Sequence, residues 1–184
     1  LQRKVIRTSF AEQAYLHLIE QLKKQIRAID TEVRRLIESD PTFKEMLLLL
    51  LSVPGVGLLL ASHFILLAQF SLEYKLLASF LGIAPHEHSS GTSVYKPATS
   101  RHFGPPAIRK LLYLAACSVC THRPQFRTYL ARKTQQGKPA RLVLNNVENK
   151  LIRIMCAVLS SKTAFIESYH SVQPLALQKA LTVS

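Results

Sequence analysis

Residues 46–68 read MLLLLLSVPGVGLLLASHFILLA, and this stretch decides the fold. Its 23 positions hold no Asp, Glu, Lys or Arg, a length that would suffice to span a bilayer. Pro54, Gly55 and Gly57 divide it, however, into pieces of about 8 and about 11 residues, each too short to cross a membrane alone. We therefore expect two buried helices joined by a tight turn, and no membrane partner.

Helical patterns continue on both sides of this pair. Apolar spacing predicts helices at about 42–52, 57–69, 73–81, 107–121, 124–135 and 140–160, so the expected class is all-α. Asp40-Pro41 separates them from an upstream helix, because Pro cannot donate to a helix and restricts the residue before it. We expect a linker helix at 1–41, a helical domain at 42–165 and a C-terminal tail at 166–184.

The upstream helix carries a narrow apolar seam. Its apolar residues alternate at spacings of 4 and 3, which is the heptad pattern of a coiled coil. The seam favours a homo-oligomer, or an antiparallel helical hairpin with sequence further upstream; an ordinary helix lying on the core is the alternative. The heptad seam consists of Tyr15, Ile19, Leu22, Ile26, Ile29, Val33 and Leu36.

Positive charge is concentrated in the second half of the chain. The net charge is +13, which usually indicates a polyanionic partner such as nucleic acid. The first 40 residues hold eight basic and six acidic side chains, whereas the stretch from Lys96 to Arg141 holds ten basic ones and no Asp or Glu. This basic band favours phosphate binding over general solubility. It consists of Lys96, Arg101, Arg109, Lys110, Arg123, Arg127, Arg132, Lys133, Lys138 and Arg141.

The turn Ser52-Val53-Pro54-Gly55-Val56-Gly57 is similar to a helix-hairpin-helix DNA-binding element. Gly55 and Gly57 would let the backbone approach a phosphate, and the next helix would present free N–H groups. A plain tight turn between two core helices requires the same glycines and remains the alternative.

Between Gly82 and Pro106 the helical period is lost, in the sequence GIAPHEHSSGTSVYKPATSRHFGPP. Its Ser, Thr, Gly, Pro and His residues predict a long functional loop, with a short hairpin near Thr92–Tyr95. A serine that attacks phosphorus needs a base and nearby cations. His86 or His88 could remove the proton, and Lys96, Arg101, Arg109 and Lys110 could bind the phosphate. A serine that merely forms a turn is the competing interpretation.

The three cysteines, Cys117, Cys120 and Cys156, lie in apolar, helix-like stretches. They are too few for a disulfide scaffold and predict buried thiols in a reducing cytoplasm. Cys117 and Cys120 have no second Cys or His pair at zinc spacing, so we expect no metal site there. The chain also lacks a starting Met, from which we expect that it begins partway through a longer protein.

Five segments in order resemble the C-terminal half of transposases of insertion-sequence family one-ten, which includes the pilin-gene invertases. They are the heptad helix, LLLSVPGVGLLLAS at 49–62, FLGIAPHEHSSGTS at 80–93, IRKLLYLAA at 108–116 and GKPARLVLNNVENKLIRIMCAVL at 137–159. The resemblance implies a transposase or DNA recombinase of mobile elements. It also implies that a loop serine forms a covalent phosphoseryl link with DNA, and this serine maps onto Ser90, with Ser89 as runner-up. Some members use a structured guide RNA, which makes RNA a second candidate partner.

The family's magnesium site lies in an N-terminal ribonuclease-H-like domain with four acidic residues. Residues 46–184 contain only Glu73, Glu87, Glu148 and Glu167 as acids, so Mg²⁺ is expected in the missing domain and no cofactor in this fragment, which should be inactive alone. The segment Thr99–Pro105 also departs from the family by one extra residue and by Pro where the family has Asn. A non-catalytic nucleic-acid-binding adaptor, or an interaction module based on the coiled coil, are the other readings. The expected location is the bacterial nucleoid.

Overall fold

Seven helices and one hairpin make up the part of the chain that the structure describes. The computed structural model covers residues 9–90, 94–100 and 104–167, with the backbone alone at 9–10, 85–90 and 94–100. The elements are α1 (Ser9–Glu38), α2 (Pro41–Leu51), α3 (Leu58–Ala68), α4 (Tyr74–Phe80), β1 (Pro85–Ser90), β2 (Val94–Ser100), α5 (Pro106–His122), α6 (Pro124–Gln135) and α7 (Ala140–Ser161). The expected all-α class is confirmed, and the helix bounds lie within one or two residues of those predicted after residue 41.

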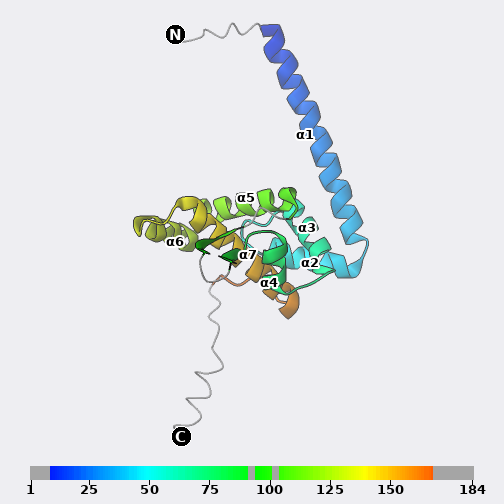
Figure 1. Ribbon diagram of the computed structural model, residues 1–184. Helices are drawn as coiled ribbons and strands as arrows, with labels where there is room; N and C mark the ends of the chain where they lie inside the picture. The colour runs from blue at the N-terminus through cyan, green and yellow to red at the C-terminus, as the bar shows by residue number, and fades with distance from the viewer. Residues whose placement is uncertain (1–8, 91–93, 101–103, 168–184) are drawn as a thin grey trace, which may run out of the picture.

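The helix α1 projects from the body formed by the other helices (Figure 1). Only its C-terminal part contacts α2 and α3, and there Ile37 packs against the core. Asp40 then starts α2, because its carboxylate accepts hydrogen bonds from the N–H groups of Thr42 at 2.7 Å and Phe43 at 3.2 Å. Along most of α1 the heptad seam faces solvent; Ile29, for example, is 62% exposed.

The stretch 46–68 forms two helices with a turn, as predicted. α2 ends at Leu51 and α3 begins at Leu58. Gly55 has a φ of +80° in the turn between them, a conformation that residues with a Cβ rarely adopt. Within the described residues, no helix combines the length and the apolarity that crossing a bilayer requires.

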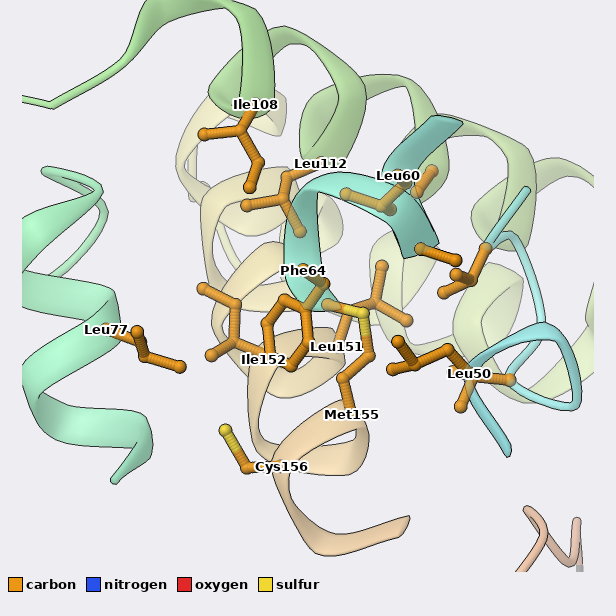
Figure 2. Packing of buried hydrophobic residues seen from close by; sticks show 14 of the residues in the cluster. Leu50, Leu60, Phe64, Leu77, Ile108, Leu112, Leu151, Ile152, Met155 and Cys156 are labelled. Carbon is orange, nitrogen blue, oxygen red and sulfur yellow. The ribbon is translucent and has the colours of Figure 1, made fainter. Parts of the chain in front are cut away.

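The helix α7 is the centre of the core (Figure 2). It contacts α2, α4, α5 and α6, and its buried residues recur every three or four positions, as one face of a helix does. Leu151, Ile152 and Met155 are fully buried and belong to one cluster with Phe64 of α3 and Leu112 of α5. Burying each such side chain stabilises the fold by about 1.5–3 kcal/mol. The other helices therefore pack around α7.

The stretch 82–106 is more ordered than its composition predicts. Instead of a long loop with a short hairpin near Thr92–Tyr95, β1 and β2 pair antiparallel over most of it. The register shifts between His86 and His88, where β2 has the additional residue, as in a β-bulge. The strands were missed because their sequence lacks the alternation of apolar and polar residues by which strands are recognised.

Candidate nucleic-acid site

The hairpin of β1 and β2 carries the serines predicted to be reactive. Ser90 is the last residue of β1 and pairs with Val94, while Ser89 pairs with Tyr95 and His88 with Lys96. The predicted phosphate ligand Lys96 therefore lies in the same hairpin as Ser90, two residues into β2. Arg101 and His102 lie outside the described residues.

Two asparagines of α7 hold the entry to this hairpin. The Nδ2 atoms of Asn145 and Asn149 both donate to the carbonyl oxygen of Ile83, at 3.0 and 3.2 Å. Asn149 also donates to the carbonyl oxygen of Asn145 at 3.1 Å. Because Ile83 is two residues before β1 and is itself buried, this asparagine clamp ties the start of the hairpin to the central helix.

The exit of the hairpin is packed against the same region. A Cβ on Gly104 would lie 2.2 Å from the carbonyl oxygen of Phe80 and 3.0 Å from the Cα of Leu81, so only glycine fits there. Gly104 also has a φ of +96°, which again favours glycine. Both ends of the hairpin therefore meet at the C-terminal end of α4, although 20 residues separate Ala84 from Gly104.

Sequence reasoning missed the asparagine clamp. The signal is present as two amides, Asn145 and Asn149, one turn apart in an otherwise apolar helix face. Such amides are half-buried here, and buried amides need partners. The partner itself was not predictable, because Ile83 is 62 and 66 residues away in sequence.

The N-terminal part of α5 follows directly on the hairpin and carries Arg109 and Lys110. Lys110 is exposed, whereas Arg109 is half-buried. Near Arg109 lies Glu148 of α7, the one charged side chain that is buried in the part described, at 7% exposure. Burial raises the pKa of Glu148 to about 7, while the positive charges of Arg141 and Arg109 act in the opposite direction. Arg109 thus faces an internal carboxylate, and Lys110 is the cation more available to a ligand.

In the folded structure, carboxylates from other parts of the chain lie close to the basic band. Besides Glu148 near Arg109 and Arg141, Glu167 approaches Arg123, with Oε1 and Nη1 at 3.6 Å. Both carboxylates come from outside the stretch between Lys96 and Arg141. The exposed pair contributes little to stability, but it reduces the local positive charge at that end of α5.

The turn at 52–57 separates the roles of its glycines. A Cβ on Gly55 would lie 2.7 Å from Val119 Cγ1 and 2.9 Å from the carbonyl oxygen of Ala115, so Gly55 is needed for packing against α5. Gly57, by contrast, has no atom within 4 Å of a built Cβ and caps α3 without a side-chain hydrogen bond. At Gly55 the turn therefore fits the alternative interpretation, a plain tight turn between two core helices. Of the two glycines, only Gly57 faces open space at a helix start.

The described residues do not fit a magnesium site. Among residues with described side chains, no three His, Cys, Asp or Glu residues gather as metal ligands would. Cys120 and Cys156 are buried and Cys117 is half-buried, all as free thiols. Burial raises the pKa of the Cys156 thiol to about 11, so this thiol stays protonated and acts as a packing group.

Comparison with known proteins shows similarity to one family. Residues 47–131 match the model of the Transposase IS116/IS110/IS902 family. This range runs from α2 through the serine hairpin and α5 into α6. It contains the predicted nucleophile and phosphate-binding residues, whereas the asparagine clamp and Glu148 lie outside it.

Individual proteins are similar over a longer range. The pilin gene-inverting protein of Moraxella lacunata is 28% identical over 149 residues, covering 79% of this chain and 46% of that protein. An uncharacterised 43.6 kDa protein of insertion element IS110 from Streptomyces coelicolor is 29% identical over 148 residues, which cover 79% and 35% of the two chains. A probable family 20 transposase of Pseudomonas aeruginosa is 27% identical over 157 residues, covering 80% and 46%.

The chain thus spans less than half the length of these relatives. The matching family model covers α3, α4, the serine hairpin and α5, and it ends before α7. On these grounds, the chain is similar to proteins of the Transposase IS116/IS110/IS902 family.

Proposed function

We propose that this chain is the serine-bearing, DNA-binding part of a transposase or site-specific recombinase. In this proposal the Ser90 hydroxyl attacks a phosphorus atom of the DNA backbone, and Lys110 and the helix start at Gly57 bind phosphates. Support comes from the family and from relatives whose names describe pilin gene inversion and transposition. Mg²⁺ in an N-terminal domain and a guide RNA as a second partner remain expectations from the resemblance.

The register of the hairpin is the observation that favours Ser90 over Ser89. Successive residues of a strand alternate between its faces, so positions 86, 88 and 90 belong to one face of β1. Residues paired across an antiparallel ladder share a face, and His88 pairs with Lys96. Ser90 is therefore on the face of two histidines and a lysine.

The other face of β1 suits a phosphate poorly. It holds position 89 together with Glu87, and Ser89 pairs with Tyr95. A carboxylate on the same face would repel the negative charge that develops on phosphoryl oxygens in the transition state. The same alternation that groups Ser90 with cations groups Ser89 with an anion.

In the proposed step, His86 or His88 takes the proton from Oγ of Ser90. Oγ then forms a bond to phosphorus, and the bond from phosphorus to one sugar oxygen breaks. That oxygen leaves with the electron pair and takes up a proton, while the phosphate remains joined to Ser90. Nearby cations stabilise the charge on the phosphoryl oxygens. The asparagine clamp and Gly104 hold the two ends of the hairpin during this step.

The decisive test replaces each serine separately in the full-length enzyme, in cells that carry its coding sequence and a donor plasmid. Ser90→Ala should abolish recombination, with a loss of at least about 100-fold because the nucleophile is gone, while duplex DNA binding stays within about twofold. Ser89→Ala should recombine nearly as wild type does. Recombination in Ser90→Ala but not in Ser89→Ala would move the nucleophile by one residue. If both variants recombine normally, the nucleophile proposal fails and the adaptor reading is left.

A further inference from the structure

A groove lies between α6 and α7, away from the residues of the proposed serine step. It encloses about 940 Å³ and is bordered by the aromatic rings of Tyr74, Phe126 and Tyr129. α6 follows α5 through a short connection and lies against α7 (Figure 1). The groove therefore depends on the same central helix that holds the serine hairpin.

Three cations border the same groove and are held against its rings. The Arg153 guanidinium lies 4.5 Å from the centre of the Tyr74 ring, and its Nη2 donates to the Tyr74 hydroxyl at 3.3 Å. Lys150 Nζ lies 5.7 Å from the centre of the Phe126 ring. The Arg132 guanidinium lies 5.9 Å from the Tyr129 ring. Such contacts keep long cationic side chains in place beside the rings.

The remaining border is polar and uncharged. Gln125, Asn146 and Asn149 supply amides, and no carboxylate is present among the described residues that line the groove. The three cations Arg132, Lys150 and Arg153 are all exposed to solvent. The groove thus offers ring faces, fixed positive charges and amide donors and acceptors within one surface.

We propose that this groove binds an unpaired strand of nucleic acid, with bases stacked on its rings and phosphates at its cations. Rings and cations together are what single-stranded binding sites use, because every base has a flat face and every linkage a charge. A duplex does not fit this chemistry, since its bases are already stacked on one another and present only their edges. The amides of Gln125 and Asn146 can pair with the edges of unstacked bases. The proposal extends the proposed function to a second nucleic-acid contact and shares with it only the class of partner.

One residue connects the two regions. Asn149 borders the groove and also donates to the carbonyl oxygen of Ile83 at the entry of the serine hairpin. A strand seated in the groove would therefore lie next to the clamp that positions the hairpin. Nothing in the groove itself depends on Ser90, Lys110 or Gly57.

The test measures binding of labelled strands of about eight nucleotides to the whole chain by fluorescence anisotropy. The probes are oligothymidine, oligouridine, an abasic strand of equal length and a duplex. Wild-type protein should bind an unpaired strand about tenfold more tightly than the abasic strand, because stacking on rings contributes a large part of the affinity. Equal binding of the abasic strand would overturn the proposal, since phosphate attraction alone would then suffice.

Variants assign the binding to the groove. Tyr129→Leu and Lys150→Gln should each weaken the unpaired strand by about tenfold and leave duplex affinity within about twofold. Phe70→Ala and Lys44→Gln are the matched controls, because Phe70 is 88% exposed and neither residue borders the groove. Lys150 is exposed, so its variant folds even if Tyr129→Leu loses stability. Wild-type affinity for unpaired strands in Lys150→Gln and in a folded Tyr129→Leu overturns the proposal.

The two kinds of strand separate the sources of the ligand. The proposal holds if the groove variants lose affinity for either oligothymidine or oligouridine. The ratio of the wild-type affinities for these two strands then shows whether the ligand is DNA or RNA. The test also distinguishes failure of the groove proposal from failure of the serine proposal. Lys110→Glu should reduce duplex affinity without affecting unpaired strands, whereas the groove variants should do the reverse.

Discussion

At the scale of single residues, the structure changes the meaning of Arg109 and Glu148 most. Arg109 was predicted as a phosphate ligand from its place in the basic band, yet it is half-buried beside the internal carboxylate of Glu148. Lys110, its neighbour in sequence, is exposed and keeps the predicted role open. A buried carboxylate with a raised pKa is a group whose protonation changes near neutral pH.

Glu148 gives a pH-dependent prediction. Burial raises its pKa from 4.5 to about 7 in the folded chain, so the folded state holds a proton in this window that the unfolded state has lost. Stability from this group is therefore greatest below the lower value and falls as pH rises through the window. Glu148→Gln removes this effect. The free energy of unfolding of this variant relative to wild type should therefore increase between about pH 5 and about pH 8, by up to about 1–3 kcal/mol. Melting temperatures of the two proteins, measured across this pH range, check the prediction. A difference that is constant with pH would contradict the raised pKa.

At the scale of elements, the two glycines of the turn between α2 and α3 have different roles. Gly55 is needed because a side chain would collide with α5, whereas Gly57 stands at the open start of α3. From the sequence, both glycines served equally as packing or phosphate-binding positions. The helix-hairpin-helix proposal therefore depends on Gly57 alone, where N–H groups and the helix dipole favour an anion.

Two substitutions separate packing from phosphate binding in this turn. Gly55→Ala should destabilise the protein by about 1–3 kcal/mol, because of its positive φ and the contacts with Val119 and Ala115. Gly57→Asp should keep or slightly raise the melting temperature, since Asp is a preferred cap, but should lower duplex affinity severalfold by repelling phosphate.

The control for charge is Lys44→Gln. It lowers the net charge by the same single unit at an exposed position of α2. Thermal unfolding and anisotropy with duplex DNA read out the two effects. If Gly57→Asp binds duplex as tightly as Lys44→Gln does, the start of α3 is a structural turn and no phosphate site.

At the scale of the whole molecule, α1 is a long amphipathic helix whose apolar seam has little of this chain to pack on. Tyr15, Ile26 and Ile29 are 68%, 57% and 62% exposed, and the helix extends from the body of the domain (Figure 1). Exposed apolar seams of this length mark association surfaces. We propose that a second copy of the helix supplies the complementary seam in a homo-oligomer.

Association through α1 is testable with one charge. Ile26→Glu should shift the protein from oligomer to monomer in sedimentation equilibrium, because it places a carboxylate in the apolar seam. Gln25→Glu introduces the same group at an adjacent exposed position outside the seam and should leave the mass unchanged. Neither residue packs against the core, so the melting temperature of the helical domain should not change. A wild-type chain that is monomeric at high concentration would refute the coiled coil.

The amino-acid sequence by itself determined the helices and their ends, because these depend on residues close together in the chain. The period of apolar side chains marks α2 to α7, and Asp40-Pro41 and the turn at Pro54 and Gly55 mark where helices stop. Only the tertiary structure decided the hairpin register that groups Ser90 with His88 and Lys96, the clamp on Ile83, the burial of Glu148 and the groove of rings and cations. Apart from the hairpin register, each of these brings together residues that are distant in sequence, and the folded core, not any local pattern, chooses their partners.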